Sequence, residues 1–319
     1  MAFGPHVARD RAPKGGPAAC VRAAEAEAAA AGFAMGAAAL FLGPKQQRRV
    51  TLTDGEAADL RALAPAGGGA LRLVAHGSYA APPFRGDLDA AAQVRRELAA
   101  CQRAGVEGLV IHLPKEPLEA VLRHLPRLVT ADAPDVRLFL ETPAVVPPHA
   151  HYATPEGLGA LFAGVREALD PTARFFGLCV DTAHVWTGGA DLSSRAAAAA
   201  WLGGLEALEG GLPPTMLHLN DSARPRGHGP DTHEALARGE IWGGFAGRLG
   251  ESGLAPFVDF ARRRGAVAIL ERRGDVVPDY RVLRALGAGG GAGAAAGAAA
   301  GAAAGAGAAA RAGPSRAAP

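Results

Sequence analysis

Residues 176–184 read FGLCVDTAH, an apolar run that ends at Asp181, with His184 three residues further on. A short, continuous apolar run is typical of a strand buried on both faces, as in parallel sheets. Here it predicts a strand over Phe175–Val180. Runs of the same kind predict seven more strands, near Ala2–Val7, Ala34–Leu42, Leu71–Ala75, Gly108–Ile111, Val136–Leu140, Thr215–Leu219 and Ala266–Leu270.

Alanine-rich amphipathic segments lie between the apolar runs and predict helices there. Eight strand–helix units within about 286 residues match the size of a (β/α)8 barrel. A doubly wound sheet is the rival α/β fold, but no GxGxxG follows the first run. We therefore expect one α/β domain, a single (β/α)8 TIM-type barrel over residues 1–286. The expected helices are Pro17–Ala31, Leu88–Ala104, Leu118–Val129, Pro155–Leu169, Ser194–Leu208, Glu234–Leu249 and Leu254–Arg264.

Residues 287–319 differ sharply from the rest, because they are almost entirely alanine and glycine. Such a segment has almost no side chains to bury in a core, so we expect a disordered low-complexity tail. The whole chain has 33 Lys+Arg against 31 Asp+Glu, and this tail holds Arg311 and Arg316 but no acid. Subtracting those two arginines leaves 31 basic against 31 acidic residues. This balance excludes a strongly basic body that coats polyanions, although local basic patches are compatible with it.

The cysteines and the hydropathy indicate a compartment. Cys20, Cys101 and Cys179 form no CxxC pair and no disulfide framework, which favours a reducing environment. The sequence shows neither a secretory leader pattern nor a run of about 20 large apolar residues. We expect a soluble, intracellular monomer, cytoplasmic in a prokaryote and nuclear or organellar otherwise.

Acidic residues and histidines stand where the predicted strands end. In a barrel these ends converge on one mouth, where catalytic groups collect. One histidine after a strand is usually structural, but six successive strands of this chain end in a His, Asp or Glu. These six residues, with His184 and the DxH pair after the seventh strand, are His76, His112, Glu141, Asp181, His184, His218, Asp231, His233 and Glu271. The other histidines, His6 among them, form no comparable set.

The donor types predict metal ions. Carboxylates buried at strand ends are costly unless cations or hydrogen bonds compensate them. Imidazoles suit zinc or another first-row ion, and carboxylates can bridge neighbouring ions. Nine donors are too many for one ion and fit two or three. Clustered divalent ions activate water and stabilise the oxygens of a phosphoryl displacement, so the sequence predicts a phosphodiesterase or nuclease.

From about residue 3 to residue 275 the chain resembles endonuclease IV, the family-2 apurinic/apyrimidinic (AP) endonucleases. The resemblance rests on KQQRR (45–49), HGSY (76–79), CVDTAH (179–184), HLND (218–221), DTH (231–233) and ILE (269–271). It implies a barrel with three zinc ions that cleaves duplex DNA 5′ to abasic sites. The expected products are a 3′-hydroxyl and a 5′-deoxyribose phosphate, and blocked 3′ ends are trimmed as well.

The resemblance also implies a role for each donor. His76 and His112 would hold the first zinc, with Glu141 bridging to the second. Asp181, His218 and Glu271 would complete the second site, and His184, Asp231 and His233 the third. Attack by zinc-bound hydroxide is the expected mechanism, with Glu141 and Glu271 as catalytic carboxylates. The expected DNA-binding residues are Gln47, Arg48 and Tyr79, which would enter the gap at the lesion, and Arg224 and Arg226, which would contact phosphates.

Two alternatives compete with this hypothesis. A sugar isomerase or epimerase of the xylose-isomerase-like barrels would use Glu141, Asp181, His218 and Glu271 around one metal ion. That function leaves the other five donors, Arg48 and Tyr79 without a role. A non-catalytic DNA-binding relative would keep the fold, but a complete donor set without ions would destabilise the barrel.

Overall fold

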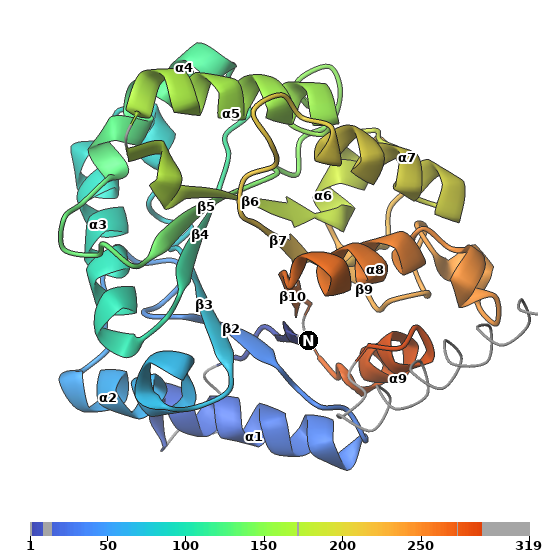
Figure 1. The fold of residues 1–319 in the computed structure, drawn as a ribbon, viewed down its shortest axis with the longest axis horizontal. Coiled ribbons are helices and arrows are strands. Elements are labelled where there is room, and N and C mark those ends of the chain that lie inside the picture. Colours follow the sequence, from blue (N-terminus) through green and yellow to red (C-terminus); the bar gives the residue numbers. More distant parts are fainter. Residues whose placement is uncertain (1, 9–14, 171, 273, 289–319) are drawn as a thin grey trace, which may run out of the picture. The chain divides into compact units, whose positions relative to one another are not determined.

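One parallel sheet of eight strands forms the centre of the protein in a computed structural model, with helices around it (Figure 1). The structure describes residues 2–8, 15–170, 172–272 and 274–288. The strands follow one another in the order β1-β10-β7-β6-β5-β4-β3-β2. Their bounds are β1 Ala2–Pro5, β2 Ala37–Phe41, β3 Arg72–His76, β4 Gly108–His112, β5 Arg137–Glu141, β6 Phe176–Asp181, β7 Thr215–His218 and β10 Val267–Leu270.

The sheet closes on itself at β1 and β2. The Gly36 amide donates to the Phe3 carbonyl at 2.9 Å, and the Val7 amide donates to the Ala39 carbonyl at 2.7 Å. His6 forms a parallel bridge with Ala39. These contacts join the two strands at the ends of the sheet order and complete the predicted (β/α)8 TIM-type barrel.

Helices alternate with the strands and cover the outside of the barrel (Figure 1). They are α1 Gly16–Ala30, α2 Asp54–Leu63, α3 Leu88–Ala104, α4 Leu118–His124, α5 Pro155–Leu169, α6 Thr182–Thr187, α7 Arg195–Glu206, α8 Leu254–Arg264 and α9 Val277–Ala285. Short 3-10 turns occur at Pro65–Gly67, Pro83–Arg85, Leu125–Leu128, Thr172–Phe175, Gly243–Phe245 and Leu249–Glu251. A small ribbon pairs β8 Asp221–Ser222 with β9 His233–Glu234.

Side chains along each strand point alternately into the barrel and out toward the helices, so the core has two layers. On β2, Ala37 and Ala39 point into a small cluster inside the barrel, whereas Ala38 and Leu40 pack outward in the larger cluster under the helices. Successive side chains of a strand point to opposite faces, so one short run serves both layers. This explains why the strands are apolar throughout.

The predicted helix over Glu234–Leu249 is wrong. That segment contains β9, turns and the two 3-10 pieces at Gly243–Phe245 and Leu249–Glu251. The buried Asp221 carboxylate accepts hydrogen bonds from the amides of Gly239 and Ile241, and Ala237 has a φ of 60°. A left-handed residue and amides directed at a distant carboxylate are incompatible with a continuous helix.

Two further expectations concern the surroundings of the barrel. The predicted tail lies outside the described residues from position 289 onward. Among the helices of the described residues, none has the length and apolar character needed to cross a membrane.

Candidate metal centre

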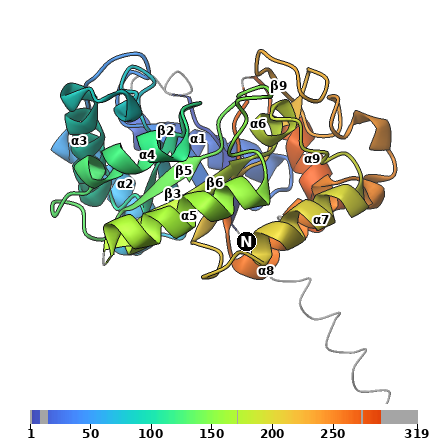
Figure 2. The same cartoon turned by 90° about the horizontal axis from the view of Figure 1, so that it is seen from above.

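The strand ends bring the predicted donors together at one mouth of the barrel. In the sheet register, His112 is opposite Glu141, and Asp181 is opposite His218. In Figure 2, α6 and β9 lie on the side of the molecule away from the start of β1. His184 on α6 and His233 on β9 reach the strand ends, since their Nε2 atoms are 4.0 and 3.6 Å from Asp181 Oδ2. Parallel strands therefore place side chains from distant parts of the sequence in one cluster.

The first group of donors contains His76, His112 and Glu141, whose ligand atoms lie within 4.8 Å of one another. Glu141 Oε2 is 3.2 Å from His76 Nε2 and 3.0 Å from His112 Nε2. His76 Nδ1 donates a hydrogen bond to the Gly77 carbonyl at 2.9 Å, which fixes the orientation of the ring. Nε2 is then the ring atom that can bind a metal ion. His112 is 40% exposed, so this group opens to solvent.

The second group contains Glu141, Asp181, His218 and Glu271 and is buried more deeply. His218 Nδ1 lies 2.8 Å from Glu141 Oε1, 2.9 Å from Glu271 Oε2 and 3.9 Å from Asp181 Oδ2. Glu141 thus presents Oε2 to the first group and Oε1 to the second. A carboxylate divided in this way has the geometry of a bridging ligand.

The third group contains His184, Asp231 and His233, and it lies against Asp181, whose ligand atom is within 4.8 Å of those of the two histidines. Asp231 Oδ2 is 3.4 Å from His184 Nε2 and 3.1 Å from His233 Nε2. The opposite ring nitrogens are engaged with main-chain carbonyls, His184 Nδ1 with Thr142 at 2.8 Å and His233 Nδ1 with Glu271 at 2.6 Å. Each Nδ1 therefore donates a proton to a carbonyl, and each Nε2 faces Asp231 and would bind an ion once its own proton is released.

The carboxylates and imidazoles of the cluster stabilise one another's charged forms. Burial would raise the pKa of Glu141 and Glu271, but the charge of His218 holds both pKa values well below the usual range. Burial would lower the pKa of His184 and His233, but Asp181 and Asp231 raise these pKa values to about 10 and about 9. The ionised carboxylates keep protons on the neighbouring imidazoles. A cation that binds the same carboxylates can replace those protons.

Two atoms of the third group lack hydrogen-bond partners among the described residues. They are Asp231 Oδ1 and His233 Nε2, and both are buried. A buried polar atom without a partner is costly, and coordination to a cation removes that cost. Mixed imidazole and carboxylate donors fit first-row divalent ions, zinc among them. The residues present therefore fit several metal ions.

Sequence reasoning missed several residues beside these donors, Cys179, His6 and Asn220 among them. His6, set apart from the predicted cluster, has Nδ1 3.4 Å from Glu271 Oε1 and its ring centre 6.3 Å from that of His76. Asn220 donates from Nδ2 to Asp181 Oδ2 at 2.6 Å. His6 directly follows β1, so the rule that identified the other strand ends could have found it. Nothing near Asn220 in the sequence identified its partners.

Tyr79 and Arg48 lie at the rim of the mouth. The Tyr79 ring stacks on His112, with centres 5.5 Å apart and planes 12° apart, and 39% of the residue is exposed. Arg48 Nε donates to the Ala80 carbonyl at 2.7 Å, and its guanidinium pairs with Asp87. Gln47 is exposed, and its carbonyl accepts from Ser78 Oγ at 2.8 Å. The KQQRR and HGSY loops are thus joined beside the first group.

Arg224 and Arg226 lie on the loop between β8 and β9 and are exposed. Arg226 pairs with Asp191 at 3.3 Å. Trp186 Nε1 donates to the Arg224 carbonyl at 2.9 Å, which fixes the loop to α6. The structure therefore places both arginines on the loop that carries Asp231, outside the cluster itself.

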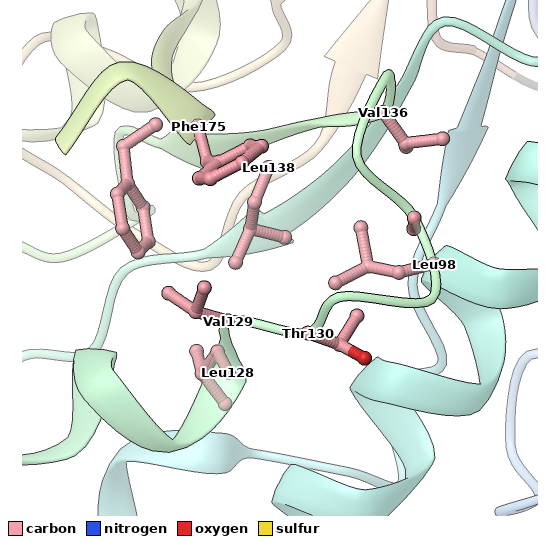
Figure 3. A pocket seen from close by; sticks show the side chains of 9 residues that line it. Leu98, Leu128, Val129, Thr130, Val136, Leu138 and Phe175 are labelled. Carbon is pink, nitrogen blue, oxygen red and sulfur yellow. The ribbon is translucent and has the colours of Figure 1, made fainter. Parts of the chain in front are cut away.

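A small pocket elsewhere offers no comparable chemistry (Figure 3). Its walls come from α3, from the segment around Val129 and Thr130, and from the starts of β5 and β6. The lining residues are Leu98, Leu128, Val129, Thr130, Ala133, Val136, Leu138, Phe175 and Phe176. None of these side chains is a metal ligand of the kind found at the mouth.

Comparison with known proteins identifies the class of barrel and then the family. The family described as "Xylose isomerase-like TIM barrel" matches residues 26–273. A "Probable AP endonuclease" of African swine fever virus (isolate Tick/South Africa/Pretoriuskop Pr4/1996) is 36% identical over 205 residues, which are 63% of this chain and 68% of that protein. The chain therefore belongs to AP endonuclease family 2, the endonuclease IV-like proteins.

Solved structures agree with this placement. A crystal structure described as "AsfvAP:AG" superposes with a TM-score of 0.80 at 30% identity, covering 89% of this chain and 96% of that one. Endonuclease IV from Thermus thermophilus gives a TM-score of 0.66 at 26% identity, covering 90% of this chain and 98% of that one. Both matches span nearly the whole described barrel.

Proposed function

We propose that this protein is a DNA repair endonuclease that cleaves the phosphodiester 5′ to abasic sites in duplex DNA. It leaves a 3′-hydroxyl and a 5′-deoxyribose phosphate, and it also trims blocked 3′ ends. The main supporting observation is the set of three adjoining donor groups at one mouth, the first two of which share Glu141, with Arg48 and Tyr79 at the rim. The name of the viral relative, "Probable AP endonuclease", supports the choice of substrate.

We assign one zinc ion to each donor group. When bound, the ions would supply Lewis acidity to the phosphodiester and lower the pKa of water. The first would be held by His76, His112 and Glu141, the second by Glu141, Asp181, His218 and Glu271, and the third by His184, Asp231 and His233.

Glu141 and Glu271 are the proposed catalytic carboxylates because each reaches both of the first two groups. Glu271 Oε1 is 3.8 Å from His76 Nε2, and Oε2 is 2.9 Å from His218 Nδ1. The two carboxylates therefore set the spacing of these groups. A phosphodiester bound between the first two groups would be held in the orientation that in-line displacement requires.

The rim provides the proposed contacts to DNA. Removal of a base leaves a gap in the stack, and the exposed Tyr79 ring and the Arg48 guanidinium can fill it or stack on its neighbours. Gln47 lies beside Arg48 on the same loop. Arg224 and Arg226 are assigned to backbone phosphates, where exposed arginines act as bidentate donors.

The single-metal sugar isomerase is the alternative, because the second group alone forms a four-donor set. That activity would leave the first and third groups, with His76, His112, His184, Asp231 and His233, without a role. Metal content separates the two activities, since the isomerase needs one ion and the nuclease three.

The test is incision of an end-labelled duplex bearing one abasic site by zinc-loaded protein, with Glu271→Ala as the control. We expect a cut 5′ to the lesion with a 3′-hydroxyl end, and no cut by the control. If protein that holds three zinc ions makes no such cut, the proposed substrate is wrong. If it holds one ion and converts a sugar, the nuclease assignment fails altogether.

A further inference from the structure

Asp181 lies within reach of two donor groups. Its Oδ2 is 3.9 Å from His218 Nδ1 in the second group. The same atom is 3.6 Å from His233 Nε2 and 4.0 Å from His184 Nε2 in the third. On these distances alone, Asp181 could serve either ion or bridge both.

One oxygen of Asp181 is already occupied by the main chain. Oδ1 accepts from the amides of Ala183 at 2.8 Å and His184 at 3.0 Å, which caps the start of α6. Capping by a carboxylate satisfies amides that have no partner within the helix. Only Oδ2 is left to face the donor groups.

Asn220 fixes that second oxygen. Asn220 Oδ1 accepts from the Glu271 amide at 2.9 Å, and Nδ2 donates to Asp181 Oδ2 at 2.6 Å. Because the Glu271 amide can only donate, it determines which side of the Asn220 amide carries the oxygen. The Nδ2 hydrogens must then face Asp181.

Asn220 itself is held rigidly. The residue is 1% exposed. Its main-chain amide donates to Thr182 Oγ1 at 2.9 Å, and its carbonyl accepts from the same hydroxyl at 2.7 Å. The side-chain amide therefore points from the short link between β7 and β8 toward two residues of the second group, Asp181 and Glu271, with little freedom to rotate.

We propose that Asn220 is a positioning residue that commits Asp181 to the second metal ion. A carboxylate oxygen has two lone pairs. The Asn220 Nδ2 hydrogen takes one of them on Oδ2, which leaves one for a single ion and prevents Asp181 from bridging to the third group. The bond to the Glu271 amide places the other carboxylate of the second group at the same time. This inference rests on the proposed metal assignment and does not depend on the DNA substrate.

The experiment compares stepwise zinc binding by the full chain and by Asn220→Ala. Metal-free protein is titrated with zinc against a chelating indicator, and the visible absorption of the cobalt-loaded protein is recorded. Loss of an outer partner of a metal ligand typically costs about 10–100-fold in affinity, so one stepwise dissociation constant should rise by that factor. The cobalt bands should change as well, since the coordination of Asp181 changes.

Gln93→Ala is the matched control. Gln93 is also a buried side-chain amide, but it bonds to Glu97 and Arg96 on α3 instead of to a donor of the cluster. Its loss should leave the zinc constants and the cobalt spectrum unchanged. If Asn220→Ala also leaves them unchanged, or if Gln93→Ala alters them equally, Asn220 has only a packing role. If the unaltered chain takes up no ions, the metal assignment fails first.

Discussion

At the end of the barrel where the strands begin, Arg72 pairs with Glu107 through two hydrogen bonds, of 2.9 and 2.7 Å. Arg137 also lies near this pair, so the anion there is neutralised by arginines, which keep their charge without exchanging protons. At the other end, the described ion-pair partners of Glu141, Asp181, Asp231 and Glu271 are all histidines. Imidazoles neutralise carboxylates only while they hold protons. Bound protons at the mouth can therefore be replaced by cations, whereas the arginine pairing at the opposite end leaves no such exchange.

Of the changes considered, Glu141→Gln should cause the largest loss of activity. The amide keeps the shape but removes the charge that both the first and second groups share. We expect the incision rate to fall by more than about 100-fold, while the affinity for duplex DNA is kept. Replacing a residue that only hydrogen-bonds to a metal ligand typically costs about 10–100-fold, and Glu141 is a proposed ligand itself. Single-turnover cleavage and fluorescence anisotropy measure the two effects. Full activity of the variant would refute the shared role of Glu141.

Zinc loading should release protons at the mouth. The raised pKa values of His184 and His233, about 10 and about 9, keep both rings protonated at pH 8 in the metal-free protein. Ligation requires neutral rings, so the third site should release about two protons, and its affinity should rise roughly 100-fold per pH unit near pH 8. Calorimetry in buffers of different ionisation enthalpy counts the protons. Histidines with an ordinary pKa of about 6.5 would release almost none.

Arg48→Ala tests whether the rim contributes to the binding of abasic DNA. The change removes a guanidinium proposed to enter the lesion and also its bond to the Ala80 carbonyl. We expect binding to an abasic duplex to weaken about tenfold, or roughly 1.4 kcal/mol, with zinc content unchanged. Arg49→Ala is the matched control. Among the described contacts, those to the Ala80 carbonyl and to Asp87 belong to Arg48 and not to Arg49. Equal losses in both variants would indicate only general phosphate attraction.

Glu107→Gln should have the smallest effect. The Arg72–Glu107 pair is about one-third exposed on both sides. We expect its loss to lower the free energy of unfolding by at most about 1 kcal/mol, as is usual for exposed pairs. Zinc content and incision should not change. Urea denaturation of the zinc-loaded protein, together with metal analysis, provides the check, and a loss of zinc would contradict the contrast between the two ends.

The strands and the donors could be predicted because each depends on local sequence. An apolar run that stops at a His, Asp or Glu is visible without any tertiary information, and the barrel register then brings those residues together. The helix α2 also had a local signal, the capping box between Thr53 and Glu56, although it was not among the predicted helices.

Other features depend on partners far away in the sequence. The segment after Glu234 has helix-forming residues, but Asp221 binds its amides and imposes a loop. Asn220 matters because it contacts Asp181 and Glu271, which lie 39 and 51 residues away. Contacts of this kind follow from the closed barrel and have no period or spacing that a single sequence reveals.

Anomalous scattering at the zinc edge from crystals of the zinc-loaded protein would locate the bound ions. We expect three peaks at the mouth, each about 2.0–2.2 Å from its imidazole and carboxylate ligands, with Glu141 between the first two. A single peak surrounded by Glu141, Asp181, His218 and Glu271, with the other histidines unligated, would contradict this expectation.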